Sequence, residues 1–305
     1  MRGWIKLGQI YNPLDRDRHP KLVTHAANPL PVHIDGDVYR IFYSGRDECN
    51  RSSVGAVDFD ISKMKITVEY EAPFFVHGSQ GSFYSDGVSI GNVYEVQDRR
   101  YMLFMGWQLP PNQHWRGEIG RLELSADLAL EIQGQEPFIA LNKSNPISLS
   151  YPWVIKNTRG EYDMWYGSTL NWDAGNGEML HVIKHAKSSD GDEWKSDNFT
   201  LPHIIGLAQA FSRPTILRNE FGKYEMWFSY RGGNGRSYRI GYAKSHDGLR
   251  WGLALNECGI NVSNSGWDSQ MIEYPFVFRH KDREFMLYNG NDYGRTGFGL
   301  ALRER

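Results

Sequence analysis

Cysteine is scarce in this chain of 305 residues, which has only Cys49 and Cys258. Two such distant cysteines form neither a disulfide framework nor the CxxC spacing of a metal site, so we expect a reducing compartment. No apolar run is long enough to cross a membrane, and the N-terminal segment lacks the apolar stretch of a signal peptide. We therefore expect a soluble cytoplasmic protein with no membrane partner, no metal site and no cofactor.

An excess of either charge is also missing. Lys and Arg total 34 and Asp and Glu total 36, which gives a formal net charge of −2 with no basic tract. This balance argues against general nucleic-acid binding. Aromatic residues (14%) and glycines (32) are abundant instead. That combination favours many short strands joined by tight turns over a helical bundle.

A sequence pattern of roughly 60 residues repeats five times along the chain. The repeats, numbered here units 1 to 5, are anchored on Pro29, Gly91, Pro152, Pro214 and Pro275, and successive anchors are 61 or 62 residues apart. An aromatic residue follows each anchor by ten positions (Tyr39, Tyr101, Tyr162, Tyr224 and Phe285) and another by thirteen (Phe42, Phe104, Trp165, Trp227 and Tyr288). Five matches in constant register indicate a repeat architecture.

Each unit is predicted to form an antiparallel sheet of four strands. The first strand begins near the anchor, and the second carries the aromatic residues. In units 3 and 4 the third strand runs into Ser188–Trp194 and Ser245–Trp251, which resemble Asp-box turns and which we interpret as structural. The units predict an all-β fold, a five-bladed β-propeller forming one domain over residues 1–305. Residues 3–7 are expected to pair with residues 298–302 as the outer strand of the last blade.

One end of the propeller axis is the expected ligand site. In an up-and-down blade, the first strand begins at the end of the sheet where the second strand finishes. Residues just before the anchors and in the loops after the second strands should therefore meet there. At these positions some units have polar residues where others have small or apolar ones. Purely structural repeats would tend to look alike, so the variation points to function.

The catalytic candidates are Glu273 and Asp86. Glu273 lies two residues before the fifth anchor, where every other unit has Ala or Ser. Burial there would raise its pKa and suit it to general-acid catalysis; the structural alternative is a salt bridge with Arg213 or Arg295. Asp86, in unit 2, is the candidate second acid or base, and its alternative role is to cap a loop.

The substrate-binding candidates at the same end are Asn28, Arg46, Asp47, Trp107, Tyr151, Trp172, Arg213, Asp292 and Arg295. Arg231 and the run 291–295 lie in the same set of loops. Arg213 would pair with a phosphate or carboxylate of the ligand, or would neutralise Glu273. Trp107 and Trp172 would stack on sugar rings, or would pack under the loops.

The repeats resemble the five-bladed propellers of the glycoside hydrolase clans that contain arabinanases, β-xylosidases and invertase-type fructosidases, and the related mannoside phosphorylases. Those hydrolases typically have an Asp before Pro in blade one, an Asp in blade two and a Glu two residues before Pro as the acid. Here Glu273-Tyr274-Pro275 has the Glu-x-Pro form, in the fifth unit, and Asp86 lies in the second. The first-unit position is Asn28-Pro29, without a carboxylate. The resemblance implies a carbohydrate ligand.

Three functions follow as hypotheses. The first is a glycosidase-like enzyme that cleaves or transfers a glycosidic bond in the axial pocket. The second is a non-catalytic propeller that binds carbohydrate or sugar nucleotide, which Asn28 makes plausible. The third is a glycoside phosphorylase, in which arginines hold a phosphate that replaces the missing carboxylate as the attacking group. The expected partner is a carbohydrate or sugar phosphate.

Overall fold

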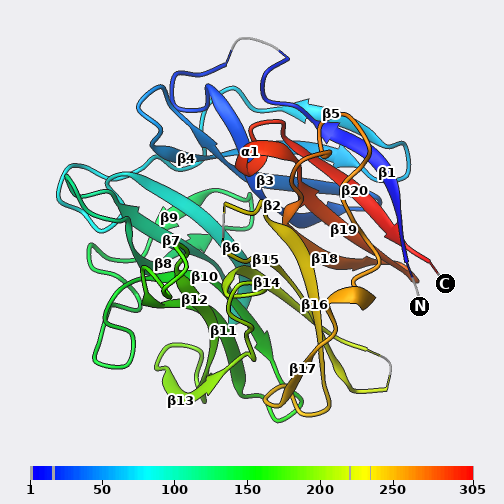
Figure 1. The fold of residues 1–305 in the computed structure, drawn as a ribbon. Coiled ribbons are helices and arrows are strands. Elements are labelled where there is room, and N and C mark those ends of the chain that lie inside the picture. The colour runs from blue at the N-terminus through cyan, green and yellow to red at the C-terminus, as the bar shows by residue number, and fades with distance from the viewer. Residues whose placement is uncertain (1–2, 16–17, 220, 234, 305) are drawn as a thin grey trace.

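The fold is built almost entirely from strands (Figure 1). The computed structural model describes residues 3–15, 18–219, 221–233 and 235–304. Within these ranges, helical structure is limited to the 3-10 turn η1 (Leu255–Glu257) and the short helical turn α1 (Asn291–Gly294). The all-β prediction is confirmed.

Consecutive strands within each unit pair antiparallel with one another. Unit 1 comprises β2 (Thr24–Asp35), β3 (Val38–Arg46), β4 (Ser52–Asp60) and β5 (Lys65–Glu69), and unit 2 comprises β6 (Gly87–Val96), β7 (Arg99–Gln108), β8 (Arg116–Leu124) and β9 (Leu130–Ile132). Unit 3 comprises β10 (Leu149–Lys156), β11 (Tyr162–Asn171), β12 (Leu180–Ser188) and β13 (Lys195–Thr200). Unit 4 comprises β14 (Ala210–Arg218), β15 (Tyr224–Arg231), β16 (Arg239–Ser245) and β17 (Trp251–Leu253), and unit 5 comprises β18 (Glu273–His280), β19 (Arg283–Asn289) and β20 (Phe298–Arg303).

The N-terminal strand β1 (Trp4–Tyr11) completes unit 5. It pairs antiparallel with β20, with Ile5 opposite Leu302 and Lys6 opposite Ala301, so the pairing expected of residues 3–7 is present. The ammonium of Lys6 lies 2.6 Å from the buried carboxylate of Asp268. Both chain ends consequently lie side by side (Figure 1).

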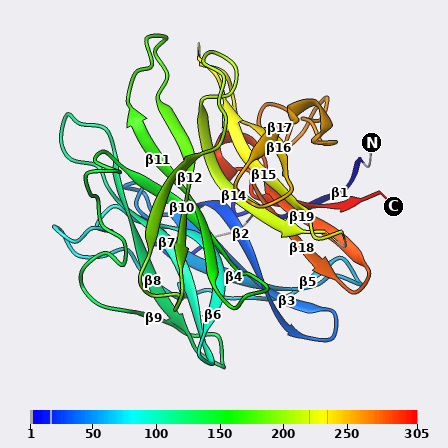
Figure 2. The ribbon, with the colours of Figure 1, turned by 90° about the horizontal axis from the view of Figure 1, so that it is seen from below.

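The first strands of the units contact one another in a closed cycle. β2 contacts β6, β6 contacts β10, β10 contacts β14, β14 contacts β18, and β18 returns to β2. Seen from below, β2, β10 and β14 lie near the middle of the molecule (Figure 2). The starts of these strands are thereby brought together, although they are far apart in the sequence.

The repeated aromatic residues of the second strands form much of the core. Phe42, Phe104, Trp165, Trp227 and Tyr288 are all almost fully buried. The aromatic residues three positions earlier point to the opposite face of the strand, and four of them are buried as well. Both faces of the second strands are therefore covered, which explains why the aromatic pattern recurs in every unit.

The two Asp-box segments form turns, as predicted. The Asp190 carboxylate accepts hydrogen bonds from the backbone N–H groups of residues 192 and 193, each over 2.9 Å. Asp247 accepts equivalent bonds from residues 249 and 250. The indole of Trp251 is buried and donates to the Gly248 carbonyl over 2.8 Å. These segments hold loops and contribute aromatic packing.

A β-bulge interrupts every first strand at its anchor. The strand registers shift between Ala27 and Leu30, Ile90 and Val93, Ser150 and Trp153, Ser212 and Thr215, and Glu273 and Phe276. The anchor prolines lack the N–H that a regular ladder needs, which accounts for the interruption in four units. A bulge redirects side chains, so the residues around the anchors turn away from the regular alternation.

Candidate functional site

Four residues that directly precede an anchor adopt left-handed backbone conformations. Their φ angles are 56° for Asn28, 35° for Tyr151, 46° for Arg213 and 51° for Tyr274. Non-glycine residues rarely adopt positive φ, and such residues concentrate at functional sites. The recurrence at equivalent positions of four units marks the end of the sheets where the first strands begin and the second strands finish. We call it the anchor end.

Glu273 is the central carboxyl group of the anchor end. Its side chain is completely buried, at 0% exposure, and neither carboxylate oxygen has a hydrogen-bond partner among the described residues. Burial raises the pKa of Glu273 well above its ordinary value, and the Asp292 charge adds to this effect, whereas the charges of Arg231 and Arg46 oppose it. The group is thus set up to hold its proton near neutral pH, as a general acid must.

Arg231, at the end of β15, is fixed by contacts from three units. Its Nε lies 2.9 Å from Oε2 of the buried Glu178, and its Nη1 donates to the Tyr293 hydroxyl over 2.9 Å. The guanidinium also lies over the ring of Tyr238, 4.7 Å from its centre. These contacts hold a positive charge near Glu273. Tyr293 belongs to the run 291–295 noted in the sequence, whereas Glu178 and Tyr238 were not singled out, because the pattern around the anchors does not include them.

The loop after β19 connects Glu273 to unit 1. Asn289, opposite Glu273 in the sheet, donates to the Ala26 carbonyl over 2.7 Å and accepts from the Asn28 backbone N–H over 2.9 Å. The side-chain oxygen of Asn28 is buried without a hydrogen-bond partner in the described structure. Asp292, with a φ of 55°, is exposed in the same loop. Its charge acts on Glu273, so two of the sequence candidates meet here.

Arg213 is buried, at 2% exposure, and makes no ion pair within the described residues. Its guanidinium donates to the main-chain carbonyls of Tyr274 (2.7 Å), Pro275 (3.4 Å) and Pro29 (2.9 Å). Burial lowers the pKa of Arg213 to about 9. The alternative that Arg213 or Arg295 neutralises Glu273 is not observed. Instead, Arg213 ties the first strand of unit 4 to those of units 5 and 1.

Tyr151 and Tyr274 form an aromatic pair beside Glu273, with ring centres 5.5 Å apart. Burial raises the pKa of both phenols, and the charge of Glu273 raises each further. The two tyrosines therefore remain neutral and can donate hydrogen bonds near the carboxyl group.

Two further arginines lie where units 1 and 5 meet. Arg46, opposite Thr24 in the sheet, donates to the Asn50 side chain over 2.8 Å. The pKa of the neighbouring His25 is lowered to about 3, first by burial and then by the charges of Arg46 and Arg295. Neither arginine forms an ion pair in the part of the chain that the structure describes. Arg46 thus adds a second positive charge near Glu273, beside that of Arg231.

Three sequence candidates are engaged in local contacts. The Asp86 carboxylate accepts from the backbone N–H of Leu109 over 2.9 Å, which is the loop-capping alternative. Asp47 pairs with Arg51 at 2.9 Å. Trp107 donates to the Ser52 hydroxyl over 3.1 Å. Asp292, rather than Asp86, is the carboxylate whose charge raises the Glu273 pKa.

Trp172 lies in the loop after β11 and is stacked on His114, with ring centres 4.5 Å apart. Trp115 meets Trp172 edge-on at 5.1 Å. Neither His114 nor Trp115 was a sequence candidate, since the loop before β8 varies between units. The half-exposed indoles form a second feature of the anchor end.

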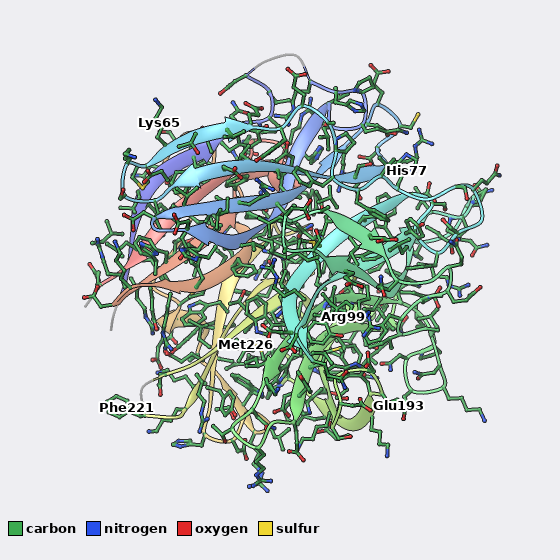
Figure 3. The ribbon with its side chains drawn as sticks, turned by 180° about the vertical axis from the view of Figure 1, so that it is seen from behind. Lys65, His77, Arg99, Glu193, Phe221 and Met226 are labelled. Carbon is green, nitrogen blue, oxygen red and sulfur yellow. The ribbon has the colours of Figure 1, made fainter. Side chains whose placement is uncertain are left out.

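Two surface cavities lie away from the anchor end. One, of about 870 Å³, lies between the β14–β15 and β18–β19 turns and is lined by Phe221, Arg279 and Glu284 among others. Phe221 is 77% exposed and projects from the edge of the molecule (Figure 3). The charged groups lining this cavity largely pair with one another, as Arg279 does with Glu284 at 3.0 Å.

Two features are absent from the described ranges. No group of three or more His, Cys, Asp or Glu side chains is arranged to hold a metal ion. No helix there combines the length and the hydropathy required to cross a membrane.

No protein-family model matches the chain. Two Mycobacterium tuberculosis proteins are similar over its whole length: "Uncharacterized protein MT1551", from strain CDC 1551, and "Uncharacterized protein Rv1502", from strain H37Rv. Each is 44% identical over 307 residues, covering 99% of this chain and 99% of the relative.

Solved structures with the same fold include glycoside hydrolases. A thermostable family-43 glycoside hydrolase has a TM-score of 0.69 at 16% identity, with 95% of this chain and 91% of that chain covered. A structure from the GH130 family of mannoside phosphorylases, described as containing glycoside hydrolases for β-1,2 mannosidic linkages, has a TM-score of 0.70 at 13% identity, with 99% and 93% covered. A further glycoside hydrolase has a TM-score of 0.73 at 12% identity, with 99% and 91% covered. The chain thus has a propeller glycoside hydrolase fold.

Proposed function

The chain belongs to the family of the Mycobacterium tuberculosis proteins MT1551 and Rv1502, and from this premise we propose that it is a carbohydrate-active enzyme that cleaves or transfers a glycosidic bond at the anchor end. We further propose that units 1 to 5 are the blades of one five-bladed propeller, with β1 completing the last blade. The closed cycle of contacts between the first strands supports this arrangement.

The observation that carries the proposal is the unpaired, buried carboxyl of Glu273. Buried polar groups in proteins almost always have hydrogen-bond partners. Here both oxygens of Glu273, Oδ1 of Asn28 and Nε of Arg213 all lack one among the described residues. Strain and unsatisfied polar groups at one place are typical of sites that bind a ligand. A glycosidic oxygen would supply the missing partner of Glu273.

In this mechanism, Glu273 acts as the general acid. Its proton passes to the leaving glycosidic oxygen as the bond to the anomeric carbon breaks. Tyr151 and Tyr274, both neutral, would orient the sugar by hydrogen bonds. Asp292 would be the second carboxylate, because it lies in the adjoining loop and is open to water. It would activate the attacking water in an inverting reaction, or attack the anomeric carbon itself in a retaining one.

Phosphorolysis is a second candidate, favoured by one observation. Arg46 and Arg295 both act on His25 and have no carboxylate partner in the described structure, so they would accommodate an attacking phosphate. Non-catalytic carbohydrate binding is the third candidate, because Asn28 stands where the related hydrolases have a carboxylate.

A screen of aryl glycosides with and without phosphate tests these candidates. Turnover without phosphate supports hydrolysis, turnover that depends on phosphate supports phosphorolysis, and a thermal shift by sugars without turnover supports binding alone. Glu273→Gln should lower turnover by about 10²-fold or more, the usual scale for a general acid. The matched control is Glu131→Gln, on the exposed side of β9. Unchanged turnover in Glu273→Gln would exclude Glu273 as the acid.

A further inference from the structure

The loops after β7 and β11 bring His114, Trp115 and Trp172 together at the anchor end; we call these residues the aromatic cluster. The His114 and Trp172 rings are nearly parallel, at 17°, with centres 4.5 Å apart. The Trp115 ring stands at 78° to Trp172, at 5.1 Å. The cluster thus has two flat indole surfaces set at a steep angle.

Core packing does not account for the aromatic cluster. His114 is exposed, and both indoles are partly exposed. The apolar clusters formed by the described core residues include Trp153, Trp165 and Trp251, but neither indole of the aromatic cluster. Exposed tryptophans cost hydrophobic free energy when nothing covers them, so their assembly in one place points to a ligand.

The buried His181 contacts the aromatic cluster and is itself held by hydrogen bonds. The His181 ring lies 5.9 Å from that of Trp115, and its nitrogens are hydrogen-bonded to Ser150 Oγ (2.6 Å) and Thr169 Oγ1 (2.7 Å). Burial lowers the pKa of His181 to about 3, so the ring is neutral. Gly167 leaves room for this contact, because a Cβ there would lie 2.1 Å from Ser150 Oγ and 2.4 Å from His181 Nε2. The support is therefore rigid.

The hydrogen bond between His181 and Ser150 connects the cluster to the part of the chain next to Glu273. Ser150 precedes Tyr151, whose ring lies 5.5 Å from that of Tyr274, and Tyr274 follows Glu273 in the chain. His181 with Ser150, and then the tyrosine pair, form a chain of contacts from the cluster to the residue next to Glu273. A sugar hydrogen-bonded to Glu273 would then leave the indoles to the next sugars of a longer chain.

We propose that the aromatic cluster binds a sugar of an oligosaccharide whose scissile bond lies at Glu273, which makes a chain of several sugars, and not a simple glycoside, the preferred substrate. This inference rests on the proposed function and adds the substrate class. Indoles offer a large, rigid apolar surface with a polar N–H, which matches the C–H face and the hydroxyl rim of a pyranose or furanose ring.

The test measures how affinity depends on chain length. Glu273→Gln protein, which binds without turnover, is titrated calorimetrically with gluco-, manno-, xylo- and arabino-oligosaccharides, from monosaccharide to hexasaccharide. Trp172→Ala and Trp115→Ala are introduced into the same background, with Trp172→Phe as the conservative variant. Phe221→Ala, at an exposed aromatic residue of the β14–β15 turn, is the control outside the cluster. Near-ultraviolet circular dichroism and melting temperature report on folding.

We expect affinity to rise with chain length and Trp172→Ala to weaken the longer ligands by about five- to tenfold, the scale of one aromatic contact. Mono- and disaccharides should bind equally well to both proteins, and Trp172→Phe should recover most of the loss. An equal effect on short and long ligands, or no effect on either, would overturn the inference while leaving catalysis at Glu273 intact. Failure of the wild-type protein to bind or turn over any member of the panel would count against the proposed function as well.

Discussion

The guanidinium of Arg213 donates a 2.7 Å hydrogen bond to the main-chain carbonyl of Tyr274, and not to the carboxyl group of the preceding residue, Glu273. A buried arginine and a buried glutamate in adjacent strands would be expected to form an ion pair. Because the arginine is bound to backbone carbonyls instead, the carboxyl group is left without a cationic partner of its own. Burial is therefore the largest influence on the pKa of Glu273, which it raises against the charges of Arg231 and Arg46.

Removing the Glu273 carboxyl should stabilise the fold at neutral pH. The pKa of Glu273 is raised in the folded protein. As the pH rises, the unfolded chain therefore loses this proton before the folded protein does, at a pH near the ordinary pKa of 4.5. Stability is then lost as pH rises above that value. We expect Glu273→Gln to melt about 2 °C or more above the wild type at pH 7, the shift that about 1 kcal/mol produces in a large domain. The difference in melting temperature should shrink towards pH 4, and calorimetry at several pH values would measure it. A difference that does not change with pH would show that the Glu273 charge is not its cause.

Arg231 should set the basic limb of the pH–rate profile. Its charge lowers the pKa of Glu273 against the larger effect of burial. Arg231→Met should therefore move the basic limb of kcat/KM to higher pH, because Glu273 would keep its proton longer. Arg231→Lys retains the charge and serves as the matched variant, for which the limb should remain near that of the wild type. Identical profiles for all three proteins would exclude the electrostatic role.

Arg213→Met should destabilise the protein without creating a new charge. The change removes three hydrogen bonds to buried carbonyls of units 1 and 5. Leaving such acceptors unsatisfied costs roughly 1–3 kcal/mol each, so the free energy of unfolding should fall by about 3 kcal/mol or more. Urea denaturation would measure the loss. Arg159→Met, at an exposed turn, is the control and should change stability by less than about 0.5 kcal/mol.

His185 should stabilise the outer part of unit 3 by bridging two carboxylates. The buried ring lies 2.6 Å from Asp197 through Nδ1 and 3.1 Å from Asp163 through Nε2. Burial raises the pKa of Asp163, but the hydrogen bonds from His185 and Asn157 outweigh it, and the net effect lowers that pKa. A carboxylate with a lowered pKa contributes stability above its unfolded value, and this is lost as pH falls through the folded value.

The measurable consequence is a pH-dependent loss in His185→Gln. At pH 7 the free energy of unfolding of the variant should be about 2 kcal/mol lower than that of the wild type. The loss stays below the full cost of an unpaired buried charge because both aspartates are partly exposed. The deficit should narrow as the solution is acidified below the ordinary aspartate pKa. A deficit that is the same at pH 7 and pH 3 would show that ring packing, and not charge, is responsible.

The repeat itself carried much of the fold prediction. The anchor spacing located the start of every first strand, because a bulge with its proline or glycine recurs in each unit. The repeated aromatic residues located the second strands in the same way, because nearly all of them are buried in the core. The pairing of the N-terminal strand with β20 could likewise be predicted, because unit 5 lacked a fourth strand of its own.

The sequence placed the candidate residues at one end of the sheets, but it could not predict their contacts. Asp86 was paired with Glu273 by unit position, yet its carboxylate is bound to the backbone of Leu109. Glu178 and Arg231 come together from units 3 and 4, and no spacing in the sequence indicates that pair. Such contacts depend on loop conformations, which vary between units and leave no periodic signal in the sequence. The positive φ of Asp292 is one example.

The pairing of β1 with β20 has a consequence for the order of folding. Residues 4–11 leave the ribosome well before their partner, residues 298–303. Until then, the edge of β1 has no permanent neighbour, and the ring stays open during synthesis. Among the strand pairings of the described residues this one joins the most distant parts of the sequence, so its loop-closure entropy should make it a late and slow step. A circular permutant that joins the adjacent termini and opens the chain between units would turn this step into a local hairpin and should refold faster.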